Sequence, residues 1–256
     1  MQIVAVQMNM AWEDKAANHQ RLRDLLAGAT IEPGALVIVP EMFETGFSMN
    51  LQATAQSEER HGEALLRELA GQYQAAVMGG VAGPVIDGVS RNEAVVFGPD
   101  GTELVRYQKM QPFTLTGEDK YYPAGGVPKI FQWQGIKIAP FVCYDLRFPE
   151  LFRPAVRQGA ELITLIACWP AARSEHWVRL LQARAIENLA VVVGVNRCGE
   201  EPNLLFDGRS SAFDHMGNTL FEASAEEQVI TTEIDIAAAR RWREKFPALR
   251  DITHCP

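Results

Sequence analysis

The stretch IAPFVCYDLRFPE, residues 138–150, decides how the rest of the chain is interpreted. Its first part, 138–142, is a short apolar run with the composition of a buried strand. Cys143 follows at the end of that run, and the polar group YDLR comes directly after it. Pro149 then marks the expected start of a helix. Open α/β folds place reactive groups at such strand ends, so Cys143 is a candidate nucleophile.

Cys143 has a second interpretation that its own surroundings do not exclude. A lone cysteine is commonly a small hydrophobic residue of the core. Other parts of the chain must therefore distinguish a reactive thiol from a packed one.

The composition limits the class of protein. A chain of 256 residues with 47% hydrophobic and 22% charged residues is typical of a globular protein, and we expect a single domain over 1–256. Lys and Arg total 24 against 32 Asp and Glu, which gives a formal net charge of −8. An acidic chain without a basic run is a poor candidate for binding nucleic acid or an anionic membrane.

The N-terminus and the cysteines predict the compartment. The segment MQIVAVQMNMAW has no basic residue ahead of its apolar ones, so it predicts a first strand rather than a signal peptide. No apolar stretch is long enough to span a bilayer. The four cysteines, at 143, 168, 198 and 255, form no CxxC pair. We therefore expect reduced thiols and a cytoplasmic location.

Strand and helix patterns alternate along the chain, and tight turns at PDG (99–101) and HMG (215–217) predict antiparallel hairpins. Mixed sheets covered by helices, a layered α/β architecture, are therefore expected. The expected strands are 2–8, 35–40, 75–81, 91–97, 103–107, 131–135, 136–142, 161–167, 190–195, 209–214, 218–221 and 228–234. The expected helices are 13–29, 57–70, 149–158, a long one from Ser174, and 235–243.

Two further polar residues occur where predicted strands end. Glu41 follows the buried run 35–40, and the residues after it, MFETGFSM, are apolar rather than solvating. Lys109 follows the first hairpin and precedes a long irregular segment, 111–129, whose aromatic residues argue against disorder. Together with Cys143, these residues supply a base, a cation and a nucleophile.

The motifs around these three residues resemble those of the nitrilase, or carbon–nitrogen hydrolase, superfamily. The matching motifs are PEMF with Glu41, YQK with Lys109 and VCYDLRFPE with Cys143, supported by YPAGG at 122–126 and ARAIEN at 183–188. Each motif is weak alone, but their order and separations are specific and cover nearly the whole chain. VCYDLRFPE, ACWPAAR, GVNR and REKFPAL further resemble the ω-amidase group, which hydrolyses the terminal amide of 2-oxo acids such as 2-oxoglutaramate and 2-oxosuccinamate.

The resemblance implies an α/β fold of the nitrilase type, a four-layer αββα sandwich with mixed sheets. It also implies a homodimer, with the helix from Pro149 and the C-terminal tail as contact regions. Glu41, Lys109 and Cys143 would form a catalytic triad that needs no metal or organic cofactor. Cys143 would form a thioester, Glu41 would transfer protons, and Lys109 would stabilise the oxyanion.

The same resemblance implies two supporting residues. The backbone N–H of Tyr144 would be the second donor to the oxyanion. Glu118 matches a second family glutamate that orients Lys109 or the substrate. A solvated acid in the loop GEDK is the competing interpretation of Glu118.

The substrate-binding residues are expected around the loop after the strand 161–167. Arg173 fits a substrate carboxylate with two parallel hydrogen bonds, and Trp169 would shape the pocket. Phe47 is a further candidate for lining it. Surface charge, for Arg173, and core packing, for both aromatic residues, are the alternatives. Arg147 is expected to pair with Asp145 or another acid.

The leading hypothesis is an ω-amidase-type hydrolase that converts a small 2-oxo acid amide into a 2-oxo acid and ammonia. The same chemistry on deaminated glutathione, a carbamoyl-β-amino acid or a nitrile is the alternative within the superfamily. Outside it stand a non-catalytic binding protein that retains the fold and a thiol redox protein that uses Cys143. No resolving cysteine is evident from sequence, although Cys168 is a candidate for lying near in space.

Overall fold

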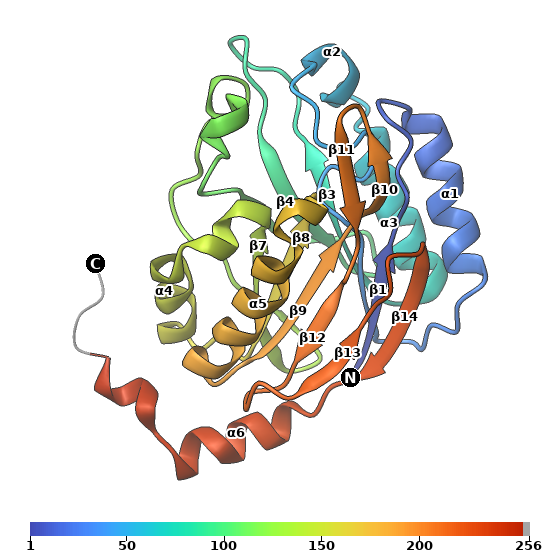
Figure 1. Ribbon diagram of the computed structural model, residues 1–256. Coiled ribbons are helices and arrows are strands. Elements are labelled where there is room, and N and C mark those ends of the chain that lie inside the picture. Colours follow the sequence, from blue (N-terminus) through green and yellow to red (C-terminus); the bar gives the residue numbers. More distant parts are fainter. Residues whose placement is uncertain (253–256) are drawn as a thin grey trace.

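Two six-stranded sheets form the centre of the structure, a computed structural model that describes residues 1–252 (Figure 1). The first sheet contains, in spatial order, β14 (Gln228–Glu233), β1 (Gln2–Gln7), β2 (Leu36–Ile38), β3 (Ala76–Ala82), β4 (Asn92–Phe97) and β5 (Glu103–Gln108). The second contains β13 (Thr219–Glu222), β12 (Ser211–Phe213), β9 (Val191–Asn196), β8 (Leu162–Ala167), β7 (Ile136–Val142) and β6 (Phe131–Trp133). A separate hairpin consists of β10 (Cys198–Glu201) and β11 (Leu204–Asp207).

Helices cover the outer face of each sheet. In Figure 1, α1 (Lys15–Ala27) and α3 (His61–Tyr73) lie on one side of the two sheets, and α4 (Phe152–Arg157) and α5 (Ser174–Asn188) lie on the other. Two further helices, α2 (Leu51–Thr54) and α6 (Ile236–Lys245), lie at the periphery. The 3₁₀ turns are Thr114–Thr116, Glu118–Lys120, Cys143–Arg147, Pro149–Leu151, Ala171–Arg173 and Ala248–Asp251. The predicted four-layer αββα sandwich is confirmed.

Side chains on the two faces of each strand pack into different layers. In β1, Val4 packs in the cluster that contains Leu22 of α1 and Leu66 of α3, whereas Ile3 packs in the cluster shared with the second sheet. Successive side chains of a strand point to opposite faces, so a strand covered on both faces is apolar throughout. This explains why the runs 35–40 and 138–142 have no polar face.

The pairing of the strands places several loops at one edge. The neighbours β1, β2 and β3 are parallel, as are β7, β8 and β9, while the remaining pairs are antiparallel. The two sheets also pack face to face, with the Thr164 hydroxyl of β8 donating to Met78 Sδ of β3 at 3.3 Å. Loops that follow β2, β7, β8 and β9 can therefore meet between the layers.

One local expectation was wrong, and one element was not predicted. The helix predicted over 149–158 is a 3₁₀ turn at Pro149–Leu151 followed by α4, because Pro154 lacks the N–H that a continuous helix would use. The hairpin β10–β11 was not predicted, since its sequence, CGEEPNLLFD, has no clear alternation of polar and apolar residues. Within residues 1–252, no helix combines the length and apolarity needed to cross a bilayer.

Candidate active site

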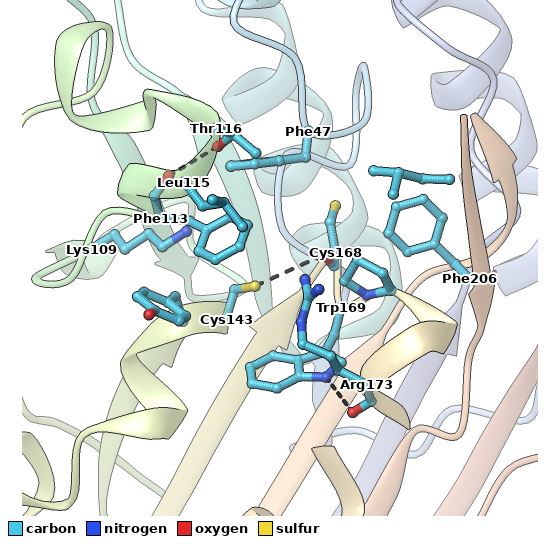
Figure 2. Close-up of a pocket in the computed structure, with 13 residues that line it drawn as sticks. Phe47, Lys109, Phe113, Leu115, Thr116, Cys143, Cys168, Trp169, Arg173 and Phe206 are labelled. Atoms are coloured by element: carbon cyan, nitrogen blue, oxygen red, sulfur yellow. Dashed lines mark hydrogen bonds between the residues drawn. The ribbon is translucent and has the colours of Figure 1, made fainter. Parts of the chain in front are cut away.

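The three strand-end residues singled out in the sequence lie together. Glu41 follows β2, Lys109 follows β5, and Cys143 follows β7. Glu41 and Lys109 are fully buried, and Lys109 Nζ donates to Glu41 Oε1 at 3.0 Å. Figure 2 shows the side chains of Lys109 and Cys143 pointing into one pocket. The structure therefore places a carboxylate, an ammonium and a thiol at a single point between the sheets.

The backbone is shaped to bring these groups close. A Cβ atom at Gly80 of β3 would lie 2.5 Å from the Cα of Glu41, so the loop passes where a side chain would block it. Cys143 has φ 47° and Met42, after Glu41, has φ 46°, both in the left-handed region. This conformation costs a residue other than glycine roughly 1–2 kcal/mol, and strain of this kind is concentrated at functional sites.

Lys109 is held between two carboxylates. Its ammonium donates to Glu118 Oε2 at 2.9 Å as well as to Glu41. Glu118 is fully buried, and its Oε2 also accepts from the backbone N–H of Phe113 at 2.6 Å. The interpretation of Glu118 as a solvated loop acid is therefore wrong. Its contact is to Lys109, as the resemblance implied.

Asn92 joins the same cluster and was missed in the sequence. Its Nδ2 donates to Glu41 Oε1 at 2.8 Å and to Glu118 Oε1 at 2.9 Å. Asn92, Glu41, Lys109 and Glu118 thus form a closed ring of hydrogen bonds. The available signal was an amide residue at the start of the strand NEAVVF, since a buried polar side chain requires partners.

The loop after β8 binds the second carboxylate oxygen and the backbone of Glu41. The backbone N–H of Cys168 donates to Glu41 Oε2 at 2.8 Å, and Cys168 Sγ donates to the Glu41 carbonyl oxygen at 3.3 Å. Cys143 Sγ lies 3.9 Å from the Cys168 carbonyl oxygen. Cys168 therefore lies beside the site, as one alternative anticipated, but its thiol is directed to the backbone of Glu41.

Burial and neighbouring charges together shift the pKa values of Cys143 and Lys109. Burial raises the pKa of the Cys143 thiol well above its ordinary value, and Glu41 raises it further, while Lys109 opposes them only partly. For Lys109, burial alone would lower the pKa, but Glu118 and Glu41 reverse that effect and raise it well above its ordinary value. At neutral pH the site therefore contains a neutral thiol beside an ammonium ion.

A cavity of about 190 Å³ opens above these groups. Its walls are largely apolar and come from the loops after β2, β5, β7 and β8 and from the β10–β11 hairpin (Figure 2). The lining residues are Phe47, Lys109, Phe113, Leu115, Thr116, Cys143, Tyr144, Cys168, Trp169, Pro170, Arg173, Leu204 and Phe206. All the predicted substrate-binding residues are among them, whereas Leu204 and Phe206 were not predicted.

Arg173 brings positive charge to an otherwise apolar wall. Its guanidinium lies 5.4 Å from the centre of the Phe113 ring, and no salt bridge within residues 1–252 includes it. Its carbonyl oxygen accepts from Trp169 Nε1 at 2.8 Å, so Trp169 fixes the turn that carries Arg173. Trp169 is buried and also lines the cavity, so it has both roles considered from the sequence, core packing and shaping the pocket.

Phe47 and Tyr144 frame the reacting groups. The ring of Phe47 lies 5.1 Å from Lys109 Nζ and also packs on the apolar clusters outside the pocket. Tyr144 directly follows Cys143, and its ring contacts Phe113 and Phe148 at centroid distances of 4.9 and 5.1 Å. The backbone N–H of Tyr144 is thereby held next to the thiol.

The expected pairing of Arg147 with Asp145 was wrong. Asp145 is buried and accepts from the Tyr107 hydroxyl at 2.7 Å and from the Val142 N–H at 2.9 Å. Burial raises the pKa of Asp145 to about 6, even though these donors lower it. Arg147 instead contacts His176 Nδ1 at 3.2 Å, since the local 3₁₀ turn directs Asp145 inward.

Across residues 1–252, no group of three or more His, Cys, Asp and Glu side chains is placed to hold a metal ion.

Comparison with known proteins agrees with this geometry. The family model described as carbon-nitrogen hydrolase matches residues 2–244. The chain is 36% identical to the ω-amidase YafV of Yersinia enterocolitica, covering 98% of this chain and 96% of that protein. It is 32% identical to the 2-oxoglutaramate amidase of Bacillus subtilis, covering 85% and 84%.

A solved structure extends the likeness to the fold. The protein XC1258 from Xanthomonas campestris, described as a CN-hydrolase superfamily protein with an arsenic adduct in its active site, has a TM-score of 0.89 and 36% identity to this chain. The match covers 98% of this chain and 96% of that one.

The neutral thiol gives a prediction about pH. Because burial and Glu41 raise the pKa of Cys143, its alkylation by iodoacetamide should quicken about tenfold per pH unit from pH 7 to 9, as the thiolate fraction grows. Mass spectrometry of the Cys143 peptide measures the rate, with Cys143→Ala as the control for other thiols. A rate that levels off below about pH 8 would instead mean a preformed thiolate–ammonium pair.

Proposed function

This chain belongs to the carbon–nitrogen hydrolase family and is an amidase, and we propose that it releases ammonia from the terminal amide of a small 2-oxo acid. The substrates that fit this proposal are 2-oxoglutaramate and 2-oxosuccinamate. The observation that carries it is the contact of Lys109 with Glu41 beside the Cys143 thiol, at the base of a small cavity that also contains Arg173.

The first half-reaction makes a thioester. Cys143 Sγ attacks the amide carbon while its proton passes to Glu41, because the thiol is neutral before attack. The carbonyl oxygen becomes an oxyanion, which the Lys109 ammonium and the Tyr144 backbone N–H stabilise. Preorganised donors of this kind are each worth roughly 2.7–4 kcal/mol of the barrier. Glu41 then gives its proton to the nitrogen, the C–N bond breaks, and ammonia leaves.

The second half-reaction regenerates the enzyme. A water molecule gives a proton to Glu41 and attacks the thioester carbon, and the C–S bond breaks as the acid product forms. Glu41 returns the proton to the departing Cys143 sulfur. Glu41 must hold its position through both transfers, and the donors from Lys109, Asn92 and Cys168 supply that restraint.

The size and charge of the cavity support a small anionic substrate. At about 190 Å³ the cavity is smaller than the ~300–1,000 Å³ that is usual for ligand pockets. A 2-oxo acid amide of four or five carbons suits this space better than deaminated glutathione, which has the bulk of a tripeptide. Arg173 can bind the distal carboxylate by donating two parallel hydrogen bonds to it.

The proposal predicts a defined substrate preference. Ammonia release should be fastest from 2-oxoglutaramate, compared with glutamine, deaminated glutathione and a simple nitrile. Cys143→Ala should lower kcat by roughly 10⁴–10⁶-fold and Glu41→Gln by roughly 10²–10⁴-fold. Glu103→Gln, at an exposed end of β5, is the matched control. Ammonia from none of these substrates, with a folded protein, would favour a binding or redox function instead.

The role of Arg173 is tested separately. Arg173→Met should raise KM for 2-oxoglutaramate about 10–100-fold with kcat nearly unchanged, because a charge-assisted hydrogen bond contributes about 1.5–3 kcal/mol. An amide without a carboxylate should show no such change. Arg179→Met is the control, since Arg179 lies exposed on α5 and does not line the cavity. An unaltered KM in Arg173→Met would refute this assignment.

We also propose a homodimer in the cytoplasm. Ile186, Met216 and Phe246 are each about half exposed, at 49%, 47% and 50%. They lie where the turn 215–217 contacts both α5 and α6. Gln182 donates to the Gly217 carbonyl oxygen at 2.9 Å, and the Trp242 ring lies 6.3 Å from that of His215 and 5.6 Å from that of Phe246. This apolar patch supports an interface beside α5 and α6. The end of the C-terminal tail, 253–256, lies outside the described residues.

The dimer has a direct test. Sedimentation equilibrium should give twice the mass of one chain, and Phe246→Glu should shift the protein to a monomer because it buries a charge in the contact. A monomeric wild-type protein at micromolar concentration would exclude the dimer.

A further inference from the structure

Asn196 is the last residue of β9 and Arg197 follows it, in the GVNR motif, and neither takes part in the reaction described above. Both are buried, with exposures of 1% and 0%. A buried guanidinium is costly unless its donors are satisfied, so its partners indicate what it holds in place.

Arg197 fixes the β10–β11 hairpin. Its guanidinium contacts Glu201 Oε2 at 2.5 Å and donates to the carbonyl oxygens of Glu200, at 3.2 Å, and Met10, at 3.1 Å. It also lies 4.3 Å from the centre of the Phe206 ring. Arg197 therefore joins both strands of the hairpin to the segment after β1.

Asn196 joins the hairpin to the pocket wall. Its Oδ1 accepts from the Trp169 backbone N–H at 2.7 Å, and its Nδ2 donates to the Trp169 carbonyl oxygen at 3.0 Å. The same Nδ2 donates to the Gly208 carbonyl oxygen, just after β11, at 2.9 Å. One side chain thus sets the spacing between Trp169 and the base of the hairpin.

The hairpin depends on these contacts because it belongs to neither large sheet. Leu204 and Phe206 of β11 line the cavity, whereas Leu205 does not and lines a separate groove that Phe206 also borders. Figure 2 shows Phe206 across the pocket from Cys143 and Lys109, with Arg173 between them. An acyl group that extends from Cys143 beyond Arg173 would therefore contact the hairpin.

We propose that Leu204 and Phe206 limit the length of the acyl group, and that Asn196 and Arg197 are positioning residues that hold this wall in place. The inference rests on the proposed function and deepens it. It predicts selection against amides whose acyl part is longer than that of 2-oxoglutaramate. A substrate longer by one carbon must displace the hairpin or leave Arg173.

The first experiment changes the wall itself. The ratio of kcat/KM for the six-carbon 2-oxo amide to that for 2-oxoglutaramate should rise about 10-fold or more in Leu204→Ala and Phe206→Ala, since one methylene in an apolar pocket is worth about 10–200-fold. Leu205→Ala, with its side chain on the opposite face, is the matched control and should keep the wild-type ratio. An unchanged ratio in the first two variants, or an equal rise in the control, would overturn the proposal.

A second readout does not require hydrolysis. The rate at which a long N-alkyl iodoacetamide alkylates Cys143, divided by the rate for iodoacetamide, should rise in Leu204→Ala and stay constant in Leu205→Ala. If wild type cleaved no amide but this ratio rose, the proposed function would fail and the wall would stand. If amides were cleaved but neither ratio changed, the wall alone would fail.

The positioning role has its own test. Arg197→Met should raise KM for 2-oxoglutaramate more than it lowers kcat, and should raise the long-to-short ratio as Leu204→Ala does. Adding Glu201→Gln removes the carboxylate left without its partner and should restore stability but not the wild-type length preference. A loss of kcat with an unchanged length ratio would mean that Arg197 only stabilises the fold.

Discussion

The ammonium of Lys109, buried between the carboxylates of Glu41 and Glu118, is the interaction on which the rest of the site depends. Two carboxylates this close repel each other, and the shared cation and the shared amide of Asn92 make their proximity tolerable. Burial, followed by the charge of Glu41, raises the pKa of the Cys143 thiol beside this cluster, and Lys109 opposes that rise only partly. The same ammonium that restrains Glu41 is then available to the oxyanion, so restraint and catalysis use one charge.

Much of the site could be predicted from sequence because the ends of buried strands can be recognised in it. Glu41 and Cys143 each follow an apolar run too short and too uniform to be anything but a doubly covered strand. Parallel pairing in each sheet and face-to-face packing then bring the two loops together. Lys109 was likewise selected by its place after a predicted hairpin, and the family resemblance added Glu118. The structure places the two side chains in contact, while their roles in the reaction remain proposals.

The rest could not be predicted because it depends on contacts across the fold. Asn92 acts through two carboxylates that lie 51 and 26 residues away, and Cys168 acts through its backbone, which no side-chain pattern reveals. Asp145 was assigned the wrong partner because adjacency to Arg147 suggested an ion pair, whereas the 3₁₀ turn directs it to Tyr107. The wall formed by Phe206 lies on a hairpin whose position is set by buried polar contacts rather than by strand periodicity.

The most direct test of the account is to trap the covalent intermediate. The protein would be mixed with 2-oxoglutaramate, quenched in acid within milliseconds, digested and analysed by mass spectrometry. We predict an acyl group on the peptide that contains Cys143, which neutral hydroxylamine removes as expected of a thioester and which accumulates before the steady state. Ammonia release with no adduct at Cys143, or with an adduct on another residue, would contradict the mechanism.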